Sequence, residues 1–157
     1  MVMQENEKQN NKKILIACYQ RPFSKKSLQK IKQILEQKQP DEVLVLSIAE
    51  QRKSSGTIES YLGRKDIQKL KNQYEKDQEI RSTGYADKIL NISKDFNISS
   101  RKIKKKGNIS KIINNTIRQY QPDSVIINHS DKSKLDKIMT GCVEDAIDQE
   151  CDNIIVV

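Results

Sequence analysis

Short apolar runs alternate along the chain with longer segments in which apolar residues recur every three or four positions. The apolar runs lie at Lys13–Cys18, Glu42–Ile48, Val125–Ile127 and Asn153–Val157, and they are rich in β-branched residues. Apolar runs of this length, bounded by turn residues, are typical of strands buried on both faces. The sequence therefore predicts four buried strands.

A fifth, weaker strand is predicted at about Ser99–Lys105, where Ile103 is the single apolar residue. Lysines on a weak strand are typical of a sheet edge that is protected against pairing with another chain. The run Arg101–Lys106 also suggests a contact with nucleic acid or with an acidic partner. Because the run lacks the interleaved aromatic residues that single-strand-binding proteins use for stacking, we favour a solvated edge strand.

Amphipathic segments separate these strands and predict helices. Ser24 is a good N-cap for the first helix, which Pro40-Asp41 ends, and Asn108 caps a later helix that ends at Gln121-Pro122-Asp123. A final helix is expected to begin at Thr140 or Gly141. The apolar faces comprise Leu28, Ile31, Ile34 and Leu35 in the first helix, Ile109, Ile112, Ile113, Ile117 and Tyr120 in the helix capped by Asn108, and Val143, Ala146 and Ile147 in the final helix.

The region between the second buried strand and the weak strand is predicted to hold a loop and a long helix. The stretch Ala49–Lys65 is polar, contains Ser and Gly, and shows no periodicity. Because Ser82-Thr83-Gly84 interrupts the helical region, we expect it to bend or divide the helix. The apolar stripes on either side of this interruption are Ile67, Leu70 and Tyr74, and Tyr85, Ile89, Ile92 and Phe96.

The order of the elements indicates the fold class. Strands that alternate with amphipathic helices are typical of a parallel sheet with helices on both faces, a Rossmann-like three-layer α/β sandwich. A length of 157 residues fits one domain, which we expect to span residues 13–157 after a disordered tail at residues 1–12. Asn128–Lys134 then lies at the carboxyl end of a central strand, where such folds usually bind ligands.

Composition and charge change this picture little. No apolar run approaches the length of a membrane span, and the first residues, MVMQENEKQNNKK, contain no apolar signal segment. Cys18, Cys142 and Cys151 have no metal-type spacing and are expected to be reduced thiols of a cytoplasmic protein. The net charge of +8 is spread along the chain, and we interpret it as a basic surface.

Three parts of the chain keep a common register: Ile14–Leu28, Gly107-Asn108, and Asp123–Val143 followed by Asn153–Val157. Together they resemble the universal stress protein (UspA-like) family over roughly residues 13–157. The first is similar to the family's opening strand, its Asp-Gly-Ser turn and its Ser-x-x-Ala-Leu helix start. The second resembles the Gly-Asp/Asn turn before the third helix. The last fits a strand that ends in Gly-x-x-Gly, nine intervening residues, and Gly-Ser at the start of a helix.

The resemblance implies an adenine nucleotide alpha hydrolase-like fold whose five-stranded parallel sheet has the order 3-2-1-4-5. It also implies a cytoplasmic, stress-related role and a homodimer joined by the last strands, here Asn153–Val157. Some members of the family bind ATP at the carboxyl ends of the first and fourth strands, and others do not. The corresponding pocket in this chain comprises Tyr19, Gln20, Ile48, Asn128, His129, Asp131, Lys132, Gly141, Cys142 and Val143.

Several residues of this pocket depart from the family pattern. Asn128 and Asp131 replace the two loop glycines, which let backbone N–H groups approach phosphates. Cys142 replaces a hydroxyl with a poor hydrogen-bond donor, and Tyr19 replaces the acidic residue that fixes the ribose or adenine. We therefore expect a vestigial nucleotide site that does not bind ATP in the family manner, with no cofactor and no metal.

Other features keep binding of ATP with magnesium open as an alternative. Lys132, Lys134 and Lys137 could bind anions, and Gly141 opens a helix N-terminus with free N–H donors. Asn128 tolerates a positive φ better than most residues, so it can keep the shape of the turn.

The sequence contains no catalytic constellation. His129 is the only histidine, and no second base, nucleophile or metal ligand is spaced to act with it. We expect His129 to be a hydrogen-bond partner in a loop, Cys142 to be a small replacement for serine, and Tyr19 to fill the pocket. We therefore predict a dimeric, stress-associated binding or regulatory protein that is not an enzyme. An ATP-binding switch ranks second, and a basic nucleic-acid-binding module ranks third.

Overall fold

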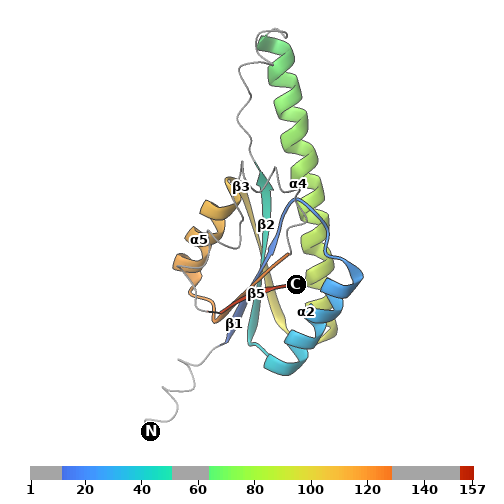
Figure 1. Cartoon of the computed structure of the whole chain (residues 1–157), viewed down its shortest axis with the longest axis vertical. Coiled ribbons are helices and arrows are strands. Elements are labelled where there is room, and N and C mark those ends of the chain that lie inside the picture. Colours follow the sequence, from blue (N-terminus) through green and yellow to red (C-terminus); the bar gives the residue numbers. More distant parts are fainter. Residues whose placement is uncertain (1–11, 51–63, 129–152) are drawn as a thin grey trace.

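A five-stranded parallel sheet forms the centre of the protein, as a computed structural model that describes residues 12–50, 64–128 and 153–157 shows (Figure 1). The strands follow the order β3-β2-β1-β4-β5, and every neighbouring pair is parallel. The fold class and strand order predicted from the sequence are therefore confirmed. The strands are β1 (Lys13–Cys18), β2 (Glu42–Glu50), β3 (Ser99–Gly107), β4 (Ser124–Ile127) and β5 (Ile154–Val156).

Helices cover both faces of the sheet. The helices α2 (Lys25–Lys38) and α4 (Arg64–Asp95) lie on one face, and α5 (Ile109–Tyr120) lies on the other (Figure 1). The side chains of β1, β2 and β4 alternate between these two layers, as the period of two in a strand requires. The α2/α4 side buries Ile14, Ile16, Val43, Val45, Ile126, Ile31, Leu35, Ala86 and Ile89, and the α5 side buries Leu15, Ala17, Leu44, Leu46, Val125, Ile127, Ile113 and Ile117.

The predicted helix caps are confirmed. The Ser24 hydroxyl accepts a hydrogen bond of 3.1 Å from the Ser27 N–H, and the Asn108 carboxamide accepts one of 3.0 Å from the Lys111 N–H. Each bond satisfies one of the N–H groups that a helix start leaves without a partner inside the helix. These caps fix where α2 and α5 begin.

The turns that lead into β2 and β4 share the sequence Gln-Pro-Asp and the same structure. The carboxylates of Asp41 and Asp123 accept hydrogen bonds of 2.8 and 2.9 Å from the backbone N–H groups of Lys12 and Lys13. The two turns therefore tie the neighbouring strands to the start of β1, which lies between them in the sheet. Of the predicted tail, Lys12 is described, and residues 1–11 lie outside the described residues.

Two predictions about the middle of the chain are wrong. Of the bend or division expected at Ser82-Thr83-Gly84, the division is wrong, because α4 is one continuous helix of 32 residues. A Cβ added at Gly84 would meet no atom within 4 Å, so packing does not require glycine at this position. The predicted loop also begins two residues too early, since Ala49 and Glu50 belong to β2 and pair with Lys106 and Gly107.

The edge position predicted for the lysine-rich strand is confirmed, because β3 ends the sheet order on one side. The strand runs two residues further than predicted, to Gly107. Among the described helices, none is long and apolar enough to cross a membrane. The helix expected to start at Thr140 or Gly141 lies outside the described residues.

Candidate functional site

Tyr19 follows the last residue of β1, and its ring belongs to the core on the α5 side. The residue is 5% exposed and packs in the same cluster as Ile48 and Ile127, from the ends of β2 and β4. Its hydroxyl donates a hydrogen bond of 3.5 Å to the Asn128 carbonyl oxygen. The ring therefore occupies the space at the carboxyl ends of three adjacent strands, where the sequence placed the candidate pocket.

Gln20 has a left-handed backbone, with φ of 50°. It stands at the glycine position of the Asp-Gly-Ser turn to which this segment is similar, so a glutamine here adopts a conformation that favours glycine. Its side-chain amide donates a hydrogen bond of 3.0 Å to a carboxylate oxygen of Glu50 at the end of β2. Glu50 thus places an acidic group beside the end of β1, although Tyr19 itself is not acidic.

The sequence does not identify Glu50 as a site residue, because its pattern predicts a loop that begins at Ala49. The signal for it is weak, since the buried Ala49 is the only apolar residue that extends β2 beyond Ile48. Pairing with β3 over its whole length is what keeps β2 extended as far as Glu50.

Asn128 follows β4 and links its end to the turn after β1. Its side-chain amide donates hydrogen bonds of 3.2 and 3.4 Å to the carbonyl oxygens of Pro22 and Arg21. Asn128 is not among the described residues with a positive φ, so it does not use the tolerance for that conformation that would let it replace a glycine. Its amide is used to join two chain segments within the protein.

The structure therefore brings together four of the predicted pocket residues: Tyr19, Gln20, Ile48 and Asn128. The others, His129, Asp131, Lys132, Gly141, Cys142 and Val143, lie outside the described residues. Within the described chain, no group of three or more His, Cys, Asp or Glu side chains is arranged to hold a metal ion.

A basic hollow of about 450 Å³ lies next to this site on the α2 side. Basic side chains of Arg21, Lys26 and Lys30 line it, together with Ser24 and Ser27 at the start of α2. Asn128 and the last strand complete the described lining. The sequence gives little signal for this hollow, because Arg21, Lys26 and Lys30 are spaced along the chain and form no basic run.

Cys18 ends β1 and is fully enclosed in the α2/α4 core. Burial without a charged partner raises the pKa of its thiol far above the ordinary value. The thiol therefore stays protonated and behaves as a small apolar group.

Three of the basic side chains of β3 are engaged with neighbouring elements. Lys102 contacts Asp87 at 2.9 Å and Lys106 contacts Glu79 at 3.4 Å, both on α4. Arg101 contacts Glu42 of β2 at 3.0 Å and lies over the Tyr120 ring, 5.8 Å from its centroid. Much of the charge of this strand is therefore balanced within the protein.

Comparisons with known proteins reveal one recurring architecture. No protein-family model matches the chain, and no curated protein matches its sequence. Among solved structures, universal stress protein UspA from Lactobacillus plantarum matches with a TM-score of 0.60 at 11% identity, covering 94% of this chain and 97% of that one. The chain has the universal stress protein fold.

Two further structures match over nearly the whole chain. A hypothetical protein that served as a test case for assigning biochemical function from structure has a TM-score of 0.61 at 19% identity, covering 94% of this chain and 95% of its own. A universal stress protein family protein from Arabidopsis thaliana, solved with AMP bound, has a TM-score of 0.52 at 14% identity. The match covers 93% of this chain and 90% of that one. The universal stress protein fold therefore accounts for the described strands and helices, and identity at this level carries no site residue across.

Proposed function

We propose that this chain is a universal stress protein-like, cytoplasmic binding or regulatory protein that acts as a homodimer without catalytic turnover. The fold and the resemblance of its three sequence segments support membership in that family. The observation that carries the proposal is the position of Tyr19. Its ring lies where the family pattern has a small acidic residue, and it is 5% exposed.

Two contacts support the absence of ATP binding in the family manner. The buried ring of Tyr19 fills space beneath the site, and the Asn128 amide is used in bonds to the turn after β1. A nucleotide that entered this space would have to displace an aromatic ring from the core, which is costly. The described half of the site therefore fits a nucleotide poorly.

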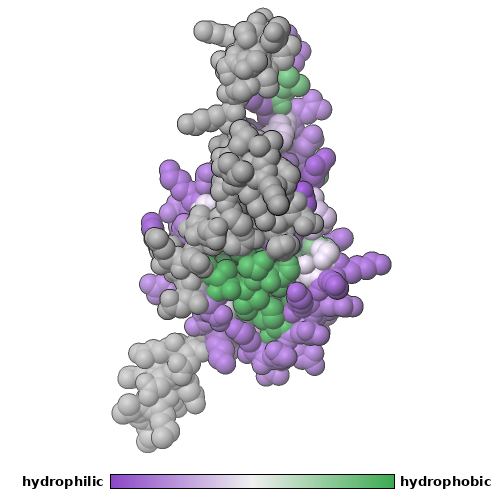
Figure 2. All heavy atoms as spheres, viewed as in Figure 1, coloured by the Kyte–Doolittle hydropathy of each residue, from purple (hydrophilic) through white to green (hydrophobic). Residues whose placement is uncertain are grey.

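The exposed edge of β5 supports the homodimer. Within the described chain β5 pairs with β4 alone, and Val156 is 40% exposed. Figure 2 shows apolar side chains in the middle of this face, where Figure 1 places β5, with polar side chains around them. An apolar strand with a free edge is a template for pairing with a second copy, so we assign Asn153–Val157 to the dimer interface.

Calorimetric titration with ATP and magnesium tests the nucleotide part of the proposal. We expect no saturable heat at micromolar ATP for the wild-type chain or for Tyr19→Phe, which keeps the ring. Micromolar binding that disappears when adenosine replaces ATP would refute the proposal, because it would show that the phosphates are held.

Light scattering coupled to size-exclusion chromatography tests the dimer. We expect Val156→Lys to shift the protein toward the monomer, since a lysine on the apolar edge opposes pairing. Leu70→Lys is the matched control, because Leu70 is also an exposed apolar residue but lies on α4. An equal mass for the wild type and both variants would exclude β5 as the interface.

An ATP-binding switch is the second candidate, and Glu50 favours it. Glu50 supplies a carboxylate at the end of β1 through its bond to Gln20, whose backbone is left-handed. In this hypothesis the carboxylate that contacts the ribose or adenine comes from the end of β2 and not from the end of β1. Glu50→Gln would then weaken ATP binding, whereas in the main proposal it changes nothing in a titration with ATP.

A basic module that binds nucleic acid or an acidic partner through Arg101–Lys106 ranks third. The ion pairs of Arg101, Lys102 and Lys106 oppose it, because binding would have to compete with carboxylates already in place. A salt titration of RNA or DNA affinity distinguishes it, since phosphate contacts produce a steep loss of affinity with salt.

A further inference from the structure

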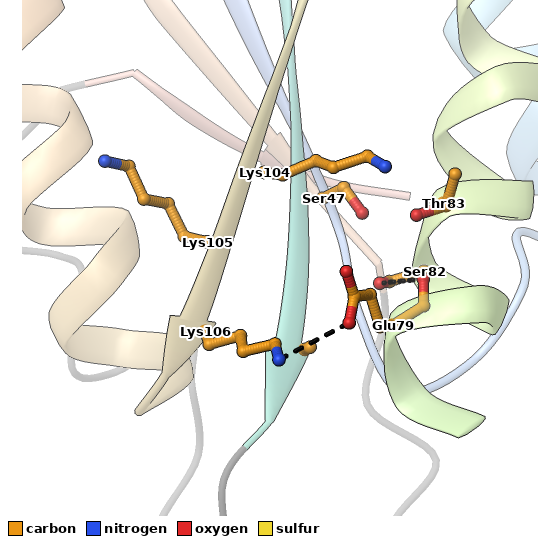
Figure 3. Close-up of a pocket in the computed structure, with 8 residues that line it drawn as sticks. Ser47, Glu79, Ser82, Thr83, Lys104, Lys105 and Lys106 are labelled. Atoms are coloured by element: carbon orange, nitrogen blue, oxygen red, sulfur yellow. Dashed lines mark hydrogen bonds and ion pairs between the residues drawn. The ribbon is translucent and has the colours of Figure 1, made fainter. Parts of the chain in front are cut away.

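A second hollow, of about 200 Å³, lies between the carboxyl ends of β2 and β3 and one turn of α4 (Figure 3). It lies on the α2/α4 side of the sheet, whereas the ring of Tyr19 lies on the α5 side. The hollow can hold a small ion or one end of a larger molecule.

Strand register brings Lys104 to this hollow. Lys104 pairs with Ser47 of β2, and Lys106 pairs with Ala49, so both lysines follow the side of the strand that faces α4. Figure 3 shows Lys104 and Lys106 extending toward α4, whereas Lys105 extends to the opposite side of the sheet. The alternation of a strand thus directs every second lysine of β3 to one face.

Three lysines of β3 face three positions of α4 that are one turn apart. Lys102 pairs with Asp87 and Lys106 pairs with Glu79, at the two ends of this row. The position between them on α4 is Thr83, which carries no charge, and no carboxylate of the described residues pairs with Lys104. The middle lysine therefore lacks the anion that its two neighbours have.

Ser47 supplies a second, independent observation. The residue is 2% exposed, and no hydrogen bond of its hydroxyl to another described group is present. The Ser47 oxygen is not among the described side-chain atoms that are both fully enclosed and unpaired, so it opens into the hollow, where water or a ligand can bond to it. Because Ser47 lines the hollow, a ligand there would supply the missing partner.

We propose that this hollow, the Lys104 site, binds a phosphate group through the Lys104 ammonium and the hydroxyls of Ser47 and Thr83. A tetrahedral oxyanion accepts several hydrogen bonds at once, and bonds between charged partners are the strong ones. Lys106 and Glu79 border the site as an ion pair. The ligand is free inorganic phosphate or a small phosphomonoester, whose phosphate group presents the same chemistry.

Nuclear magnetic resonance titration with inorganic phosphate tests the site, with chloride at equal ionic strength as the reference. We expect saturable shifts at the amides of Ser47, Thr83 and Lys104, and Lys104→Gln to raise the Kd at least about tenfold. Lys105→Gln is the matched control, because Lys105 borders the same hollow but its side chain extends to the opposite side of the sheet (Figure 3). It should change the Kd less than about twofold.

Two further variants separate the site from general electrostatics. Ser47→Ala keeps every charge and should weaken phosphate binding. This variant still tests the site if Lys104→Gln does not fold. Glu79→Gln should tighten binding, because it removes a carboxylate from the border and releases Lys106. Absence of saturable shifts, or equal weakening by Lys104→Gln and Lys105→Gln, would overturn the proposal.

Titration with glycerol 3-phosphate distinguishes the two sources of the phosphate group. Tighter binding of glycerol 3-phosphate than of inorganic phosphate supports a phosphomonoester as the ligand. Binding of inorganic phosphate alone supports the free ion. Neither result depends on the site at Tyr19, because the two sites lie on opposite faces of the sheet.

Discussion

Truncation of Tyr19 tests whether its side chain is a packed core residue or a residue that is kept for binding a ligand. The ring is 5% exposed and packs with Ile48 and Ile127. Removal of a buried aromatic side chain costs about 3–5 kcal/mol, because transfer free energy is lost and a cavity remains. We therefore expect Tyr19→Ala to lower the free energy of unfolding by about 3–5 kcal/mol.

Urea denaturation followed by circular dichroism measures this loss of free energy directly. A thermal scan of the same variant gives a second measure. In a domain of this length each kcal/mol shifts Tm by about 2–4 °C, so the melting temperature should fall by roughly 6–20 °C. Tyr19→Phe removes only the hydroxyl, whose bond to Asn128 at 3.5 Å is long. That variant should lose about 0.5–1.5 kcal/mol.

A second truncation controls for the loss of an aromatic residue as such. Tyr74→Ala removes the same side chain from a partly exposed position of α4 and should cost no more than about half as much as Tyr19→Ala. If Tyr19→Ala costs less than about 1 kcal/mol, the ring does not fill the space beneath the site. The ring would then not exclude a nucleotide from this space.

Three further changes test other parts of the fold. Gln39 and Gln121 end α2 and α5 in the left-handed region, with φ of 43° and 49°, so Gln39→Gly and Gln121→Gly should each stabilise the protein by about 1 kcal/mol in urea denaturation. Gly84→Ala should stabilise it by about 0.5–1 kcal/mol, because the added Cβ meets no atom within 4 Å and alanine favours a helix. Burial raises the pKa of the Cys18 thiol, so the unfolded chain releases this proton first as pH rises above about 8.5. The wild type should therefore lose stability between pH 8 and pH 10 more steeply than Cys18→Ala, by up to about 1.4 kcal/mol per pH unit.

Much of the sheet could be predicted because its strands are buried on both faces. A strand such as Lys13–Cys18 has to be apolar at consecutive positions when helices cover both sides, and this leaves a clear pattern in the sequence. The helix caps were equally readable, since Ser24 and Asn108 bond to N–H groups only three residues away. These signals are local, and they need no knowledge of the tertiary structure.

The continuity of α4 could not be predicted from local signals. Ser82-Thr83-Gly84 has the composition of a turn, but the helix is held by packing and pairing that are distant in sequence. Residues on both sides of Gly84 contact the sheet, since Ala86 is buried and Glu79 pairs with Lys106. The Ser82 hydroxyl donates to the Glu79 carbonyl oxygen at 3.2 Å, so it is satisfied within the helix. Tertiary contacts therefore outweigh the low helix propensity of this segment.

The topology predicted which described residues lie together at the ends of the strands, but not the bonds between them. The parallel sheet places Tyr19, Ile48 and Asn128 at one edge, as the strand order requires. The sequence did not show that Gln20 would hold Glu50, because that bond joins residues 30 positions apart at the ends of two strands. Which side chain faces its neighbour depends on how far each strand extends, and β2 extends further than its apolar run.

The lysines of β3 show why a run of charge cannot be interpreted without its period and its neighbours. Counted along the sequence, Arg101–Lys106 is a basic patch that suggests a polyanion. Counted with a period of two, the same run divides into lysines that face α4 and a lysine that faces away (Figure 3). Acidic residues spaced by two helical turns on α4 then neutralise Lys102 and Lys106 and leave Lys104 without a carboxylate. On the side of β3 that faces α4, Lys104 is therefore the lysine that no described carboxylate neutralises, which fits the proposed small anion better than a long polyanion.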